Sequence, residues 1–153
     1  MPTQAPKSLL RSPVSYARLV RGLLSAPDDR VDRQPVTRWV ALLTGITFVI
    51  AGLVKFVFHH WELHAFRSFG LPWPAALEIF AGVLETAGGI LLVRRRAVVP
   101  AATLLGVTMV VAIISSGIGH GDVIPSLTLA PALLLATLFV LLRSLGLGGE
   151  GPA

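Results

Sequence analysis

Four long apolar stretches fill most of this 153-residue chain, at residues 39–58, 75–93, 97–118 and 124–142. The hydrocarbon core of a bilayer is about 30 Å thick, and an α-helix of roughly 20 apolar residues crosses it. Each stretch is therefore long enough to span a membrane. Because a spanning segment must satisfy its own backbone hydrogen bonds, the sequence predicts an all-α membrane protein with four transmembrane helices.

The composition supports this class and limits the chemistry of the chain. Hydrophobic residues make up 54% of the sequence and charged residues only 14%, whereas about a quarter of a typical soluble domain is charged. The chain contains no cysteine, which excludes a disulfide framework, a thiolate metal site and a CxxC redox pair. Electron chemistry would therefore need a cofactor brought from elsewhere.

The positive charges predict how the chain threads the membrane, since Lys and Arg in short flanking segments are retained in the cytoplasm. Only Lys55 and Arg67 lie near the loops at 59–74 and 119–126, which we expect on the outer side. Both termini are predicted to be cytoplasmic, in a bacterial inner membrane. The net charge of +5 is thus a signal for topology and lipid rather than for nucleic acid. The charges on the predicted inner side are Lys7, Arg11, Arg18, Arg21, Arg30, Arg33, Arg38, Arg94, Arg95, Arg96 and Arg143.

Residues 1–35 form a basic segment that precedes the first apolar stretch. Between Pro13 and Pro27, helical spacing gathers apolar residues on one face and arginines on the other. A short amphipathic helix lying on the inner membrane surface is one interpretation, and a disordered tail with chance patterning is the other. Residues 146–153 are predicted to be a disordered tail.

Residues 36–145 are predicted to form the membrane domain. Short connections make neighbouring helices antiparallel, so we expect an up-down-up-down bundle whose close contacts come from small residues. Glu78, Gly82, Glu85 and Gly89 follow one another at helical spacing along one stripe of the second stretch. A neighbouring helix can approach closely at this stripe.

Three segments resemble the DoxX family of small four-span bacterial membrane proteins. They are AGLVK at 51–55, FGLP at 69–72 and GVLETAGGILL at 82–92. Members of this family are described as components of membrane oxidoreductase assemblies, some linked to thiosulfate oxidation or quinone reduction and others to oxidative-stress complexes. The resemblance implies a redox setting, with a quinone and an oxidoreductase partner subunit as the implied ligand and partner, but it does not imply a particular reaction.

The charged residues inside the apolar stretches are the candidate site. An ionised group near the bilayer centre costs about 3 kcal/mol on insertion scales, so it needs a partner, water or a proton. Counting residues places Glu85 near the midplane, and places Glu78 and Lys55 at a shared depth nearer the outer end. Lys55 and Glu78 could therefore pair, whereas pairing with Glu85 would require the Lys55 chain to reach inward.

Two interpretations of these three residues stay open. In the structural one, Lys55 and one glutamate form an ion pair that fixes the bundle, and the other glutamate is protonated and hydrogen-bonded to Thr47, Thr86 or Thr108. In the functional one, Lys55, Glu78 and Glu85 line an intramembrane pocket. Glu85 then exchanges a proton or a hydrogen bond with a quinone-like headgroup.

All four histidines, His59, His60, His64 and His120, fall in the predicted outer loops, with Glu62 and Asp122 nearby. His60 and His64 would share a helical face if the first helix continued that far. Neither loop shows a full ligand set at a recognised spacing, so we predict solvated histidines and no metal site.

Two classes of function follow. The chain is either a small membrane subunit or anchor of a quinone-linked oxidoreductase or oxidative-stress complex, or a non-catalytic protein. The non-catalytic protein would carry a small solute or hold a soluble partner at the membrane. No Walker, nucleophile-elbow or zinc-protease motif is present in the sequence, so we do not expect the chain alone to be a complete enzyme.

Overall fold

The computed structural model describes residues 28–68, 70, 72–118 and 128–147. In that part of the chain every regular element is a helix, as predicted. The amphipathic helix predicted before Pro27, the tail after residue 147 and the outer-loop residues His120 and Asp122 lie outside the described residues. The elements are α2 (Asp29–Arg33), α3 (Pro35–Val57), α4 (His59–Ser68), α5 (Pro74–Val93), α6 (Val98–Ala112), the π-helix η1 (Ile113–Ile118) and α7 (Ala130–Ser144).

Three of the helices in the described part are long and apolar enough to cross a membrane: α3, α5 and the helical segment Val98–Ser115. The last helix, α7, is apolar but only 15 residues long. It begins at Ala130, after the undescribed residues 119–127 that include the start of the predicted fourth span. The structure thus confirms the helical class, and the crossing by α7 stays a prediction.

Large apolar side chains cover the outside of the long helices. Leu43 on α3 is 61% exposed, Phe80 on α5 61% and Leu135 on α7 68%. Soluble monomers rarely expose continuous apolar surface on this scale, because it is unfavourable in water. The outward faces are those of a chain whose solvent is lipid.

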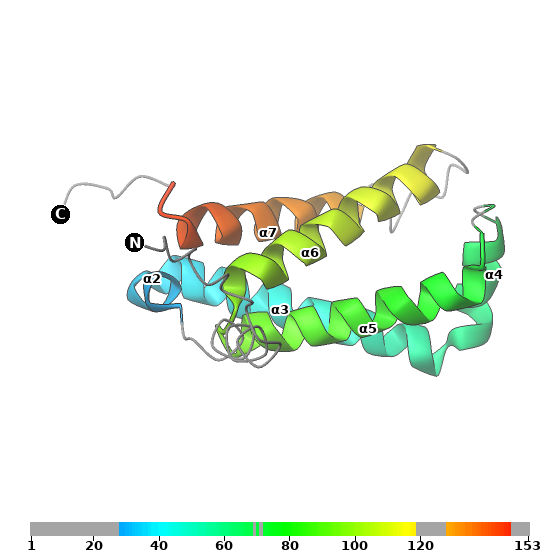
Figure 1. Ribbon diagram of the computed structural model, residues 1–153, viewed down its shortest axis with the longest axis horizontal. Coiled ribbons are helices and arrows are strands. Elements are labelled where there is room, and N and C mark those ends of the chain that lie inside the picture. Colours follow the sequence, from blue (N-terminus) through cyan, green and yellow to red (C-terminus); the bar gives the residue numbers. More distant parts are fainter. Residues whose placement is uncertain (1–27, 69, 71, 119–127, 148–153) are drawn as a thin grey trace, which may run out of the picture.

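The chain runs out along α3 and back along α5, then out along α6 and back along α7 (Figure 1). The packing of α3 against α5 is the most extensive in the molecule, and α6 packs against both α5 and α7. Pro35 and Pro74 stand at the first helical positions of α3 and α5. Proline fits there because its missing N–H would have no partner within the helix.

Glycines on both helices allow the close approach of α3 and α5. A Cβ at Gly45 would lie 2.8 Å from the carbonyl oxygen of Gly89, and a Cβ at Gly52 would lie 2.7 Å from that of Gly82. Only glycine permits this separation, so two glycines seven residues apart on each helix set the geometry of the pair.

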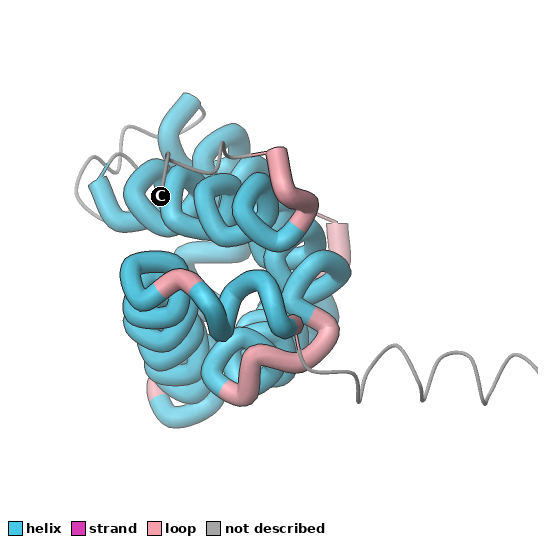
Figure 2. Tube along the Cα trace, turned by 90° about the vertical axis from the view of Figure 1, so that its left-hand side faces the viewer, coloured by secondary structure: helices cyan, strands magenta, loops and turns pink. Residues whose placement is uncertain are grey.

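The short helix α2 joins three elements at one end of the bundle. Asp28 caps α2 by accepting from the backbone N–H groups of Arg30 and Val31. Its other carboxylate oxygen accepts from the Ser144 hydroxyl at the end of α7 (2.8 Å), and its backbone N–H donates to the Arg95 carbonyl between α5 and α6. Val31 is fully buried beneath these contacts. In Figure 2, which looks along the bundle from this end, the loops around α2, after α5 and after α7 lie at the near end.

At the opposite end the structure differs from the predicted loop at 59–74. Residues 59–68 form α4, which begins almost directly after α3 and packs against α5. His60 and His64 do lie on one helix, but the helix is separate from α3 because Phe58 breaks the regular backbone between the two.

Candidate functional site

The two acidic residues of α5, Glu78 and Glu85, are both buried within the bundle, with residue exposures of 1% and 5%. They are seven residues apart, which is about 10.5 Å along the helix and close to two full turns. The same stripe of α5 carries Gly82 and Gly89, which contact α3. The sequence correctly placed both acids on the face that packs within the protein.

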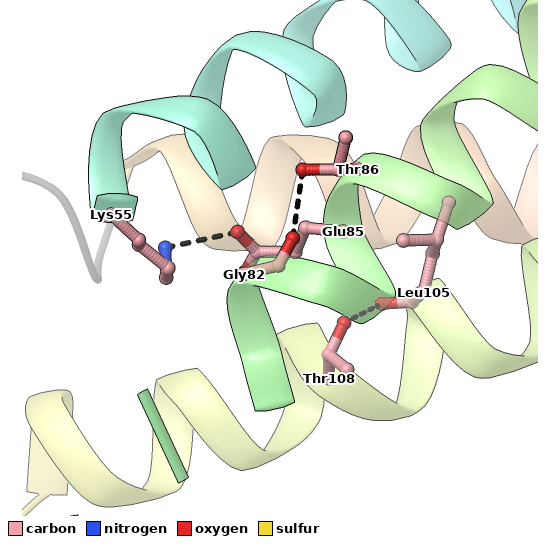
Figure 3. Close-up of polar contacts among 6 residues, drawn as sticks. All are labelled: Lys55, Gly82, Glu85, Thr86, Leu105 and Thr108. Carbon is pink, nitrogen blue, oxygen red and sulfur yellow. Dashed lines mark hydrogen bonds and ion pairs between the residues drawn. The ribbon is translucent and has the colours of Figure 1, made fainter. Parts of the chain in front are cut away.

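Glu85 forms an ion pair with Lys55 of α3. Lys55 Nζ lies 2.9 Å from Glu85 Oε2, and the two side chains are 15% and 6% exposed. Figure 3 shows the lysine extending from α3 toward the carboxylate on α5. Of the two pairings that the sequence left open, the structure shows the one in which the Lys55 chain reaches inward to Glu85, and not the pairing with Glu78.

The direction of helical side chains explains this pairing. Side chains tilt toward the N-terminus of their own helix. In the antiparallel pair, the N-terminus of α3 and that of α5 lie at opposite ends. The Lys55 side chain therefore tilts toward the α2 end of the bundle and the Glu85 side chain toward the α4 end. These opposite tilts make up for the difference in height between the two backbones.

Glu78 has a partner that the sequence analysis did not propose. Its Oε1 lies 2.9 Å from Nδ1 of His59, the first residue of α4. The Glu78 side chain is 2% exposed and the His59 side chain 42%. Among the described residues, Glu78 Oε2 has no hydrogen-bond partner. A signal for this contact was present in the sequence: His59 follows the end of the first predicted span and Glu78 lies near the start of the second, so the two lie at the same end of an antiparallel pair.

The threonines proposed as partners of the glutamates donate elsewhere. The hydroxyls of Thr47, Thr86 and Thr108 donate to carbonyl oxygens of their own helices, those of Leu43, Gly82 and Leu105. Two of these bonds are drawn in Figure 3. Helical Ser and Thr commonly bond the preceding turn in this way, so this part of the structural interpretation is wrong.

The outer histidines do not assemble a metal centre in the part of the chain that the structure describes. No group of three or more His, Asp or Glu side chains there is arranged to hold a metal ion. The rings of His59 and His60 lie 6.0 Å apart and tilted.

The arrangement supplies proton and hydrogen-bond chemistry inside an apolar bundle. An ammonium group offers three donors and an ionised carboxylate only acceptors. Their interactions are stronger in the low dielectric of the interior than in water. The site can therefore bind one polar group within the membrane, or pass a proton to it.

The fold and this site define a helical integral membrane protein with a lysine–carboxylate pair inside its bundle. A family model, DoxX, matches residues 39–117, from the second turn of α3 to the π-helix. The match covers more than half of the chain, so the chain belongs to the DoxX family, as its sequence motifs indicated. Neither the curated proteins nor the solved structures contain a match.

Proposed function

We propose that this chain is an accessory membrane subunit of a quinone-linked oxidoreductase or oxidative-stress complex, and that its Lys55–Glu85 pair binds a quinone-like headgroup. The observation that carries the proposal is the buried contact of 2.9 Å between Lys55 Nζ and Glu85 Oε2. Charged residues inside a span are costly and are typical of functional sites. In this proposal a lipophilic ligand approaches the pair from the bilayer, on the side where 15% of the Lys55 side chain is exposed.

The chemistry of the pair suits the two oxidation states of a quinone. The Lys55 ammonium can donate to a quinone carbonyl oxygen, and the Glu85 carboxylate can accept from a quinol hydroxyl. The chain has no cysteine to hold an iron–sulfur cluster. In this proposal the electrons pass to a redox centre on a partner subunit, and this chain supplies the binding site and the proton.

The proposed orientation places both termini in the cytoplasm of a bacterial cell, with four crossings of the inner membrane. The gathering of basic segments at one end of the bundle supports it. Arg30 donates to the Ser144 carbonyl, and Arg95 pairs with Asp32. The start of α3, the α5–α6 link and the end of α7 thus share an end, and that end carries most of the positive charge.

Quinone binding by the purified protein in lipid nanodiscs tests the proposal. Glu85→Gln keeps the shape of the side chain and removes its charge, and we expect it to weaken binding of a short-chain quinone at least about tenfold, which is about 1.4 kcal/mol. Asp29→Asn, an exposed acid on α2, is the matched control and is expected to bind like the parent protein.

The outcomes separate the proposal from its alternatives. Thermal unfolding of Glu85→Gln shows whether the variant folds. A folded variant that binds quinone as tightly as the parent contradicts the proposal. It would favour the non-catalytic alternative, a solute carrier or a membrane anchor for a soluble partner. Partner subunits are sought by affinity capture from mild detergent, and recovery of a redox enzyme is the expected result.

A further inference from the structure

The contact between His59 and Glu78 lies at the α4 end of the bundle, outside the Lys55–Glu85 pair. Glu78 is almost completely buried, yet only one of its carboxylate oxygens has a hydrogen-bond partner among the described residues. That partner, the imidazole of His59, has 42% of its side chain exposed. The His59 side chain therefore lies partly at the surface of the bundle, and the Glu78 side chain lies in its interior.

The remaining charged groups near these acids are few. From α3, Lys55 faces Glu85. From α4, His59 contacts Glu78, His60 lies beside His59, and the half-buried Glu62 lies about one turn further along the helix. The helix α6, which also packs against α5, has no titratable residue between Val98 and Ala112. Among the described residues, the titratable groups near Glu85 thus extend toward α4, and not toward α6.

We propose that His59 and Glu78 form a proton-exchange site that connects the Lys55–Glu85 pair with water at the α4 end of the bundle. Water molecules carry protons between Glu85 and Glu78, which are about 10.5 Å apart along α5. At Glu78 the O–H bond of the protonated acid then breaks and an N–H bond forms at Nδ1 of neutral His59. The imidazolium then releases its other ring proton from Nε2 to water. The reverse sequence returns a proton to Glu78, so atoms and charge balance without a redox step.

This inference rests on the proposed function in one respect: the route supplies protons to an acid that binds a quinone. Glu78 is the acid nearest to Glu85 along α5, and their shared stripe places both on the same face. The bond between Glu78 and His59 exists whether or not a ligand is bound.

Deuterium exchange of the two buried carboxyl groups tests the route without a quinone. The full-length protein in lipid nanodiscs, held at acid pH, is transferred to D₂O, and the carboxyl bands are followed by infrared spectroscopy. Glu78→Gln and Glu85→Gln assign the bands. We expect His59→Gln to slow exchange at Glu78 at least about tenfold, since a positioned proton-transfer group contributes on that scale or more. His60→Gln, an exposed histidine in the same helix, is the matched control and is expected to exchange like the parent protein.

Two further variants distinguish relay from packing. Free imidazole is expected to restore the exchange rate in His59→Ala, which a purely structural loss would not allow. Glu78→Gln is expected to slow exchange at Glu85. Equal rates in His59→Gln and His60→Gln, failure of imidazole to rescue, or unchanged exchange at Glu85 without Glu78 would each overturn the proposal. Because no quinone is present, loss of the quinone proposal leaves this result unaffected.

Discussion

Lys55 and Glu85 neutralise each other in a place where neither could easily stay charged alone. Removing one partner of a buried pair leaves an uncompensated charge, whereas the intact pair offsets most of the desolvation of both groups. The contact therefore affects stability mainly when one partner is removed and the other stays buried without its counter-charge. The pair places a carboxyl group and an ammonium group in contact inside the bundle.

Lys55→Met tests this at a single residue. We expect the variant to lose on the order of 3 kcal/mol in free energy of unfolding, because Glu85 is left buried without its cation. The measurement is reversible unfolding in mixed micelles. Arg67→Met, which removes an exposed cation from α4, is the control and is expected to stay within about 0.5 kcal/mol of the parent. Equal stability of the two variants would show that the ion pair contributes nothing.

At the residue scale, the sequence identified Lys55, Glu78 and Glu85 because charges inside apolar stretches are rare. It could not assign their partners. Counting rise per residue gives the height of a backbone atom, but long side chains reach a further turn along the helix in the direction of their tilt. The sequence predicts a solvated loop after the first span, whereas α4 holds the His59 imidazole against Glu78.

At the element scale, the contact between α3 and α5 depends on four glycines, which have no Cβ. Gly45 and Gly52 on α3 meet Gly89 and Gly82 on α5 nearly backbone to backbone. This contact holds Glu85 against the helix that carries Lys55. Lipid gives little hydrophobic drive for helix association, so close packing of this kind has to stabilise the pair.

Gly52→Ala and Gly106→Ala make a matched test of this contact. A Cβ at Gly52 would clash with backbone atoms of α5, whereas a Cβ at Gly106 would lie 3.6 Å from the Thr137 hydroxyl, an ordinary contact. We expect Gly52→Ala to destabilise the protein by about 1–3 kcal/mol. Gly106→Ala should be neutral or stabilising by up to about 1 kcal/mol, because alanine favours the helix. Unfolding in mixed micelles measures both, and equal losses would show that the close approach does not determine stability.

The helices themselves were largely predictable, and the deviations from prediction have local causes. The second predicted span, 75–93, differs from α5 by one residue, since Pro74 marks its start. The first helix begins four residues before the predicted span because Pro35 and the polar residues after it add an inner turn. Apolar patterning cannot show where regular α-helix gives way to a π-helix, as it does at Ile113. The sequence shows the same seven-residue glycine spacing on α3, at Gly45 and Gly52, as on α5, at Gly82 and Gly89.

At the scale of the whole molecule, the two ends of the bundle have different roles. One end is closed by α2, whose contacts join the start of α3, the α5–α6 link and the end of α7. The other end carries α4 and the only histidine that contacts a buried acid in the described part of the chain. The orientation in the membrane therefore decides which aqueous compartment the buried acids can reach.

Because the chain has no cysteine, single substitutions can report this orientation with an impermeant maleimide. Arg33, His64 and Leu147 are exposed, on α2, on α4 and after α7. We expect His64→Cys to be labelled in intact cells, and Arg33→Cys and Leu147→Cys only after the membrane is permeabilised, with a several-fold difference in labelled fraction. Such a pattern follows if the arginine-rich end stays in the cytoplasm and α7 completes a fourth crossing. Labelling of Leu147→Cys together with His64→Cys would show that α7 does not return the chain to the side of α2. Labelling of Arg33→Cys and Leu147→Cys but not of His64→Cys in intact cells would show the reverse orientation, in which the His59–Glu78 contact lies at the cytoplasmic end.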